Sequence, residues 1–303
     1  MKARTWGGLV GEAAAYVRDD TTRVPTGIPQ LDSYLRGGFR PGHVVLLIGR
    51  TEVGKSAFAG QLAVNAANAG FGAAYASLEM SREEVTIRAL SAHKHLPVED
   101  IEATLAKADL PEILALQQEL PLFGVDDSGR PDWNTLKAYV TQQSEAFGQP
   151  VRLLVVDHLR LMARYGGGRG EMERVQRLAE DAKTFAKEAD VVLVVLHQVG
   201  RSVEGSQGRK NHGDTRLTME DGMFGAEADA DVVLGVYRPE RNPDLTEPQR
   251  QAVNGVMVCQ LLKNRHGNSC IPGIVLNWKR PSMYIEQSGM EVDYLTDILK
   301  DKK

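Results

Sequence analysis

The sequence lacks several features that would mark particular classes of protein. It has only two cysteines, Cys259 and Cys270, and their spacing fits neither a CxxC motif nor a zinc finger. We therefore expect free, buried thiols in a reducing compartment rather than a disulfide framework. The formal net charge of −4 excludes a global basic field. Any nucleic-acid site must therefore be a local basic loop or groove.

Long apolar runs are also missing. The stretch VVLVVL at 191–196 is far shorter than the roughly 20 residues that cross a bilayer as a helix. The N-terminal stretch MKARTWGGLVGEAAAYVRDD has no apolar core long enough for a signal peptide. We therefore expect a soluble, cytoplasmic protein with no membrane partner.

Apolar strands and helices alternate along most of the chain, which indicates an α/β protein. Residues 43–49, 152–158, 190–198 and 230–238 have the composition of strands that are buried on both faces of a parallel sheet. The last third instead resembles strands joined by tight turns. The pattern predicts a mostly parallel, doubly wound sheet with an antiparallel extension at its C-terminal edge.

A short alanine-rich helix is predicted over residues 8–18, and the polar stretch DDTTR separates it from the rest of the chain. We assign residues 1–23 to this linker-like helix and its tether, and residues 24–303 to a single α/β domain. A helix of this length is marginal alone. It docks either on its own domain or on a neighbouring subunit, and the sequence favours neither.

The segment GRTEVGKS at 49–56 matches the phosphate-binding pattern G-x-x-x-x-G-K-[ST] at every fixed position. An apolar strand precedes it and a helix follows, as the motif requires. Lys55 is expected to reach the β- and γ-phosphates of ATP, and Ser56 to offer its hydroxyl to Mg²⁺. The predicted nucleotide-binding residues are Gly49, Arg50, Thr51, Glu52, Val53, Gly54, Lys55, Ser56 and Ala57.

Glu52 places an acid in the middle of this loop. The variable positions of the motif contribute backbone N–H groups, so the side chain can point outward. An acid there could weaken the attraction for phosphate, or it could pair with a basic group, for instance on a neighbouring subunit. A Glu52→Ala variant with unchanged ATP affinity and unchanged assembly would remove the second hypothesis.

Three polar residues are predicted at the C-terminal ends of strands, the edge where open α/β sheets bind ligands. Asp157 is expected to hold Mg²⁺, directly or through water, opposite Ser56. Glu79 is expected to orient and deprotonate the attacking water, with a helix-capping or surface acid as the alternative. Gln198 is expected to bond a phosphate and report its loss to the following loop.

That following loop, over residues 201–222, is predicted to be long and mobile, with a local excess of basic residues. It suits contacts to a nucleic-acid backbone, although a merely solvated loop would have the same composition. The candidate nucleic-acid-binding residues are Arg201, Arg209, Lys210 and Arg216.

A second basic feature, Lys263 and Arg265, lies near the C-terminus at the end of a predicted strand. Two residues at this spacing point to the same side of an extended segment. The pair can be delivered into a phosphate site as an arginine finger, or it can form part of a salt-bridged surface.

In this order, the motifs resemble those of the C-terminal motor domain of DnaB-type replicative helicases. The lead-in TGIPQLDSYLRGGFRPGHVVLLIG resembles that of RecA-like ATPases. The segments SLEM, VVDHLRLM, HQVGRSVE, EADADVVLGVYR and KNRHG are similar to the family's successive motifs, and the resemblance covers residues 24–286. It implies a RecA-like P-loop ATPase that forms a hexameric ring around single-stranded DNA, with ATP bound between subunits.

The same resemblance implies roles for individual residues. The basic pair near the C-terminus becomes a finger that acts on the neighbouring subunit's nucleotide, and residues 8–18 become a linker helix that docks on the adjacent subunit. The expected activity is that of an ATP-dependent DNA helicase or translocase in DNA replication. The residues implied to be catalytic are Lys55, Glu79, Gln198, Lys263 and Arg265, and those implied to hold Mg²⁺ are Ser56 and Asp157.

The sequence departs from the family pattern in two places. The helical N-terminal domain that precedes the linker in the family is absent from this sequence, which weakens the expectation of a primase or helicase loader as partner. The stretch TMEDGMFG at 218–225 stands where the family usually has an arginine and a glycine that contact DNA. A second class therefore stays open, a RecA-fold ATPase that acts as a recombinase- or clock-like assembly switch without unwinding.

Overall fold

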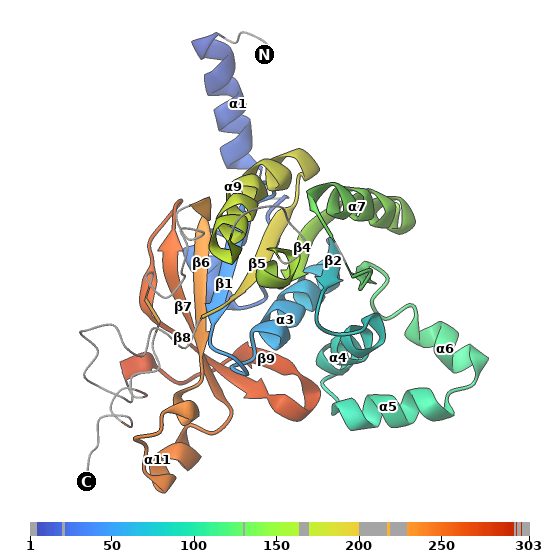
Figure 1. Cartoon of the computed structure of the whole chain (residues 1–303), viewed down its shortest axis with the longest axis vertical. Coiled ribbons are helices and arrows are strands. Elements are labelled where there is room, and N and C mark those ends of the chain that lie inside the picture. Colours follow the sequence, from blue (N-terminus) through green and yellow to red (C-terminus); the bar gives the residue numbers. More distant parts are fainter. Residues whose placement is uncertain are drawn as a thin grey trace.

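A computed structural model describes residues 5–19, 22–129, 131–163, 170–199, 217–218, 229–293, 295 and 298. One nine-stranded sheet forms the centre of the molecule, in the order β3-β2-β4-β5-β1-β6-β7-β8-β9 (Figure 1). The strands from β3 to β6 in this order are parallel, and β7, β8 and β9 are antiparallel. The predicted parallel sheet with an antiparallel C-terminal extension is confirmed.

The parallel strands coincide closely with the apolar segments of the sequence. Every residue of β1 and β6 is buried, because helices cover both faces of the sheet. The parallel strands are β1 (Val44–Gly49), β2 (Gly72–Ser77), β3 (Phe123–Asp126), β4 (Val151–Asp157), β5 (Val192–Gln198) and β6 (Val232–Tyr237). The antiparallel strands are β7 (Val256–Asn264), β8 (Cys270–Lys279) and β9 (Tyr284–Gln287).

Most helices begin at recognisable capping residues. Ser81 and Glu84 form the predicted capping box at the start of α4, each bonding the other's backbone N–H. The helices around the sheet are α2 (Pro29–Tyr34), α3 (Lys55–Asn68), α4 (Arg82–Lys94), α5 (Val98–Lys107), α6 (Leu110–Leu116), α7 (Trp133–Phe147), α8 (Leu159–Ala163), α9 (Glu171–Ala189) and α11 (Glu247–Ala252).

Two apolar layers lie on opposite faces of the sheet. Because side chains alternate along a strand, Val45 and Leu47 of β1 face the layer that contains α3. Leu46 and Ile48 face the opposite layer, which contains α7 and α9. Both cysteines are free and buried, as predicted. The two layers fix the central strands, so the strand ends that carry the candidate site are held on a rigid frame.

Helix α1 (Trp6–Arg18) stands away from this body (Figure 1). None of its residues is buried, and the side chains of Trp6 and Val17 are 80% and 67% exposed. Its contact with the body includes Arg40, whose guanidinium lies 4.0 Å from the centre of the Tyr16 ring and bonds the Tyr16 carbonyl. Among the described residues, no helix is long and apolar enough to cross a membrane.

Candidate nucleotide-binding site

The phosphate-binding motif lies in the predicted place, between the end of β1 and the start of α3. Gly54 has a φ of +99° and opens the helix. A Cβ atom on Gly54 would lie 2.8 Å from the side chains of Met257 and Trp278. A Cβ atom on Gly49 would lie 2.9 Å from the Val236 carbonyl. Both glycines are therefore required by the close packing of the loop against β6, β7 and β8.

Lys55 lies beneath the loop with its ammonium group turned inward. Its Nζ donates hydrogen bonds to the carbonyl oxygens of Gly49 and Arg50, at 3.0 and 2.8 Å. Burial lowers the pKa of Lys55 to about 8, and the nearby carboxylates of Asp157 and Glu79 partly offset this effect. Three residues predicted for the site, from three different elements, thus come within electrostatic reach of one another.

Asp157 occupies the last position of β4 and is only 2% exposed. The hydroxyl of Tyr75 on β2 donates a hydrogen bond of 2.7 Å to its Oδ2 atom. Burial raises the pKa of Tyr75 well above its ordinary value, and the negative charge of Asp157 adds to that rise. Ser56 lies on the other side of the phenol, close enough for its hydroxyl to oppose the rise. Asp157 and Ser56 are therefore brought together around one buried hydroxyl.

The two other predicted strand-end residues are also at this edge. Glu79 is exposed and follows the last residue of β2, Ser77, by two positions, so it lies beyond the strand rather than on it. Gln198 ends β5, and its Nε2 donates a hydrogen bond of 2.6 Å to the Thr51 hydroxyl of the loop. The predicted sensor is therefore in direct contact with the phosphate-binding loop.

Glu52 points outward, as its motif position predicts, and its side chain is 72% exposed. Its carboxylate lies 3.2 Å from the Arg241 guanidinium of the same chain. Its backbone carbonyl accepts a hydrogen bond of 3.2 Å from Arg238. The predicted basic partner is thus present within the chain, and a contact of Glu52 with a neighbouring subunit stays a prediction.

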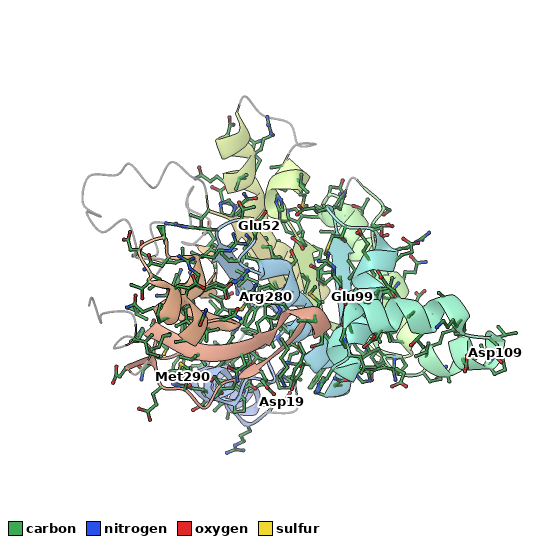
Figure 2. All side chains as sticks on the ribbon, turned by 90° about the horizontal axis from the view of Figure 1, so that it is seen from below. Asp19, Glu52, Glu99, Asp109, Arg280 and Met290 are labelled. Atoms are coloured by element: carbon green, nitrogen blue, oxygen red, sulfur yellow. The ribbon has the colours of Figure 1, made fainter. Side chains whose placement is uncertain are left out.

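Arg238 and Arg241 belong to a cluster of arginines beside the loop. Arg238 and Arg280 both bind the carboxylate of Glu240, which also accepts a hydrogen bond from the Gly255 N–H. Burial, with the positive charges of the neighbouring arginines, lowers the pKa of Arg238 to about 10. Figure 2 shows Glu52 and Arg280 close together in the middle of the molecule. The cluster ties the phosphate loop to the antiparallel part of the sheet.

Lys263 and Arg265 lie at the opposite edge of the sheet. Lys263 pairs with Val233 near the start of β6, and Arg265 follows the last residue of β7. The Arg265 N–H bonds the Asp231 carbonyl at 2.9 Å, and its guanidinium lies 3.5 Å from the Asp231 carboxylate. The length of β1, about 17 Å at 3.3 Å per residue, separates this edge from the chain's own phosphate loop.

The candidate nucleic-acid-binding residues lie outside the described part of the chain. The same holds for most of the loop predicted over 201–222, of which only residues 217 and 218 are described. The assignments of Arg201, Arg209, Lys210 and Arg216 therefore stay predictions.

The chemistry of the donor set fits a hard divalent cation. The Ser56 hydroxyl and the Asp157 carboxylate supply oxygen ligands, which Mg²⁺ prefers, and they lie near the lysine that would meet the phosphates. Across the described ranges, no group of three or more His, Cys, Asp or Glu side chains could hold a metal by itself. This agrees with a site in which Mg²⁺ takes few protein ligands and completes its shell with water and substrate phosphates.

A separate apolar groove, of about 600 Å³, lies away from the loop between α4, α5, α6 and β3. Leu90, Leu105 and Leu116 contribute to its lining, and Arg82 and Glu83 contribute polar groups. The helices α5 and α6 stand apart from the sheet in Figure 1. The groove therefore provides an apolar surface at some distance from the nucleotide site.

Sequence reasoning missed Tyr75, Arg238 and Arg241. A signal for Tyr75 was present, because it is a tyrosine among small residues in the buried strand GAAYAS, and a buried tyrosine hydroxyl usually needs a partner. Arg238 and Arg241 follow the end of β6, at the same edge as the loop. Their position becomes evident only when β6 is known to lie next to β1.

Comparison with known proteins agrees with this geometry. The family model of the DnaB-like helicase C terminal domain matches residues 23–285. The "Replicative DNA helicase DnaB" of Helicobacter pylori (strain J99) is 31% identical over 72% of this chain and 44% of that relative. The protein of the same name from Geobacillus stearothermophilus is 29% identical over 73% of this chain and 48% of that relative. The chain thus spans about half the length of the curated relatives it matches.

Solved structures support the fold. An isolated ATPase domain superimposes with a TM-score of 0.77 at 20% identity, over 95% of this chain and 100% of that one. "The Structure Of A DnaB-Like Replicative Helicase And Its Interactions With Primase" gives 0.74 at 21% identity, over 95% of this chain and 68% of that one. The KaiC-like protein PH0186 from Pyrococcus horikoshii gives 0.58 at 18% identity, over 88% of this chain and 98% of that one. The RecA-like fold predicted from the motifs is confirmed.

Proposed function

Because the chain belongs to the family of the DnaB-like helicase C-terminal domain, we propose that it is an ATP-hydrolysing motor that acts on single-stranded DNA in replication. The observation that carries the proposal is the convergence of Lys55, Asp157, Glu79 and Gln198 at one edge of the sheet. A protein that only binds ATP would not require this full hydrolysis set.

Each residue has a role that its position supports. The Lys55 ammonium leaves its two carbonyl partners and binds the β- and γ-phosphates. Ser56 and Asp157 hold Mg²⁺, which when bound neutralises part of the phosphate charge. Glu79, exposed and near Lys55, orients the attacking water and accepts its proton. Gln198 senses the γ-phosphate and passes its loss to the loop through Thr51.

The active assembly is a ring in which Lys263 and Arg265 act on the nucleotide of a neighbour. Their place at the far edge of the sheet prevents them from reaching their own phosphate loop without a large rearrangement. In a head-to-tail interface, by contrast, one edge of each subunit meets the opposite edge of the next. The predicted hexamer has this type of interface.

Helix α1 of one subunit docks on the adjacent subunit in this ring. Its exposed apolar side chains include Trp6, Val10 and Val17, and exposure of so many on one short helix is costly in water. The apolar groove between α4, α5 and α6 offers a matching surface on the neighbour. Deletion of residues 1–18 would then lower the oligomeric state in size-exclusion chromatography with light scattering.

DNA contact through Arg201, Arg209, Lys210 and Arg216 belongs to the same proposal, as does recruitment of a primase or loader. The decisive experiment measures ATP hydrolysis with and without a single-stranded oligonucleotide. It must be made at low salt, because backbone contacts weaken steeply as salt rises. Stimulation by DNA supports the motor. Hydrolysis and assembly that both ignore DNA would instead support the RecA-fold switch, a class with a structural neighbour in the KaiC-like protein.

A further inference from the structure

The Tyr75–Asp157 hydrogen bond is a buried contact next to the phosphate loop that the motifs do not account for. Its length is 2.7 Å, and the two residues are 1% and 2% exposed. Strands β2 and β4 pair in parallel with Ser77 opposite Asp157, so Tyr75 lies two residues back on the same face as Ser77. Its phenol therefore reaches along the sheet to the strand end where the carboxylate stands.

We propose that Tyr75 is a positioning residue for the Mg²⁺·ATP site, which holds one oxygen of Asp157 and leaves the other for the metal or its bound water. The inference rests on the proposed ATPase function. Carboxylates that bind metals are themselves usually hydrogen-bonded. Loss of such a partner typically lowers metal affinity or activity by about 10- to 100-fold.

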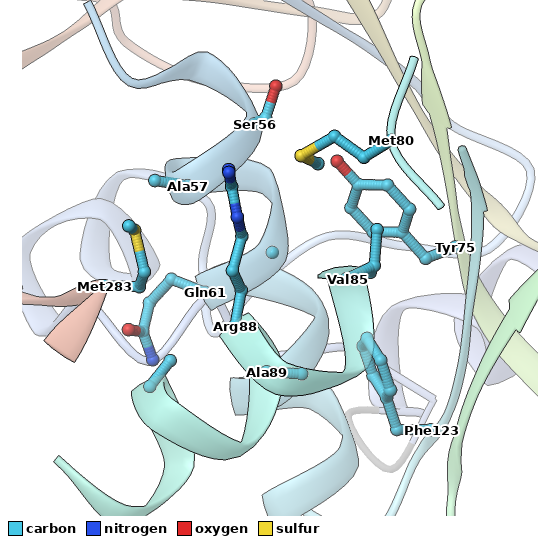
Figure 3. Close-up of a pocket in the computed structure, with 12 residues that line it drawn as sticks. Ser56, Ala57, Gln61, Tyr75, Met80, Val85, Arg88, Ala89, Phe123 and Met283 are labelled. Carbon is cyan, nitrogen blue, oxygen red and sulfur yellow. The ribbon is translucent and has the colours of Figure 1, made fainter. Parts of the chain in front are cut away.

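The surroundings of the phenol favour this role over simple core filling. Ser56, Met80 and Arg88 line a small cavity beside the ring, with about 30 Å³ of room, enough for a water molecule. Figure 3 shows the Tyr75 hydroxyl pointing toward the helix that carries Ser56, with Arg88 approaching from α4. A phenylalanine would fill the same space among the alanines of β2. The hydroxyl is thus the part of Tyr75 that the site uses.

A second consequence concerns Lys55. Its ammonium bonds the carbonyls of Gly49 and Arg50 and not the nearby Asp157 carboxylate. A carboxylate free to rotate could form an ion pair with this lysine and compete with the phosphates for it. The hydrogen bond from Tyr75 opposes that rotation, and so it keeps the acid and the lysine available for their separate partners.

The test uses Tyr75→Phe, which keeps the ring and removes only the hydroxyl. Mn²⁺ replaces Mg²⁺, and free Mn²⁺ is measured by electron paramagnetic resonance with a non-hydrolysable ATP analogue bound to the full chain. We expect Tyr75→Phe to weaken Mn²⁺ binding by about tenfold. Binding of the analogue in EDTA should be unchanged, a separation that a merely structural loss would not produce. A thermal melt checks that the variant is folded.

Asp157→Asn distinguishes failure of this inference from failure of the proposed function. If Asp157→Asn leaves Mn²⁺ affinity intact, the metal role of Asp157 is wrong and the positioning role falls with it. If Asp157→Asn weakens Mn²⁺ binding and Tyr75→Phe does not, only the positioning role is overturned. In the double variant, Tyr75→Phe should add no further loss, because the oxygen that it positions is already gone.

Discussion

The Glu52 carboxylate lies 3.2 Å from the Arg241 guanidinium, so the acid in the phosphate-binding loop has a cation beside it. Glu52 has a positive φ of 59°, and its carbonyl is held by Arg238. The carboxylate is thereby kept at the outer side of the loop, and its charge is partly compensated. The loop can therefore carry an acid without losing its attraction for phosphate.

Arg241→Ala should weaken ATP binding, because the negative charge of Glu52 is then uncompensated near the phosphates. Both side chains are about half exposed or more, so we expect a modest effect of about two- to fivefold. Fluorescent-ATP titrations at low and high salt would measure it, and the effect should shrink as salt screens the charge. An equal loss from Arg241→Ala in a Glu52→Ala background would show that Arg241 does not act through Glu52.

Gly54→Ala should destabilise the protein and abolish ATP binding. The added methyl would lie 2.8 Å from Met257 and Trp278, and φ at this position is +99°. The strain and the clash together should lower the free energy of unfolding by on the order of 2–3 kcal/mol. Urea unfolding curves and ATP titrations would measure the two effects.

Gly60→Ala is the matched control for this change. It lies on the same helix, α3, and an added Cβ there meets no atom within 4 Å. We expect no loss of ATP binding and a gain in unfolding free energy of about 0.5–1 kcal/mol from helix propensity. If the two variants behaved alike, close packing at Gly54 would not be the cause of its requirement.

Asp231 should make stability fall at acid pH. Its buried carboxylate bonds Lys183 at 2.5 Å and the Val44 N–H at 2.9 Å. Burial alone would raise the pKa of Asp231, but these hydrogen bonds and the charge of Lys183 outweigh it and hold the pKa below its ordinary value. The stabilisation is therefore complete above the unfolded pKa of about 3.9, and it is lost as pH falls through the lower folded pKa.

Asp231→Asn tests that prediction. At pH 7 it should lower the free energy of unfolding by about 1–3 kcal/mol, since it removes a charged hydrogen-bond partner of Lys183. Below pH 4 its stability should depend less on pH than that of the wild type. The control Glu188→Gln removes an exposed partner of Lys137 and should cost under about 1 kcal/mol. Parallel acid slopes for wild type and Asp231→Asn would contradict the assignment.

The sequence predicted the nucleotide site well where a local pattern carries the chemistry. Gly49, Gly54, Lys55 and Ser56 belong to one continuous motif, whose strand and helix follow from apolar composition and periodicity. Asp157 and Gln198 could be placed because parallel strands end at one edge. These residues depend on local backbone form and on a general rule of sheet topology, and both can be read from one chain.

The rest depends on which strands become neighbours. The Tyr75 hydroxyl meets Asp157 because β2 and β4 pair, although 82 residues separate them in sequence. Arg241 meets Glu52 because β6 lies beside β1. No local pattern encodes either contact. The end of β2 was also placed slightly too far along, so that Glu79 lies beyond the strand, where the chain turns toward α4.

The edge-to-edge arrangement predicts that sites are shared between subunits. Lys55→Ala should be inactive because it removes the phosphate-binding cation. Arg265→Ala should hydrolyse ATP at least 1000-fold more slowly, in line with the roughly 10³–10⁵ that an arginine finger contributes. ATP affinity of Arg265→Ala should stay near that of the wild type, because Arg265 lies far from its own loop.

A mixture of these two inactive variants should recover hydrolysis. An Arg265→Ala subunit keeps an intact phosphate loop, and a neighbouring Lys55→Ala subunit supplies the missing arginine to it. With random mixing at equal amounts, about a quarter of head-to-tail interfaces combine these two intact halves. Steady-state ATPase of the reassembled mixture should therefore approach a quarter of the wild-type rate, with light scattering to confirm equal assembly. A finger that acted within its own chain would leave every site defective, and the mixture would then stay as inactive as either variant.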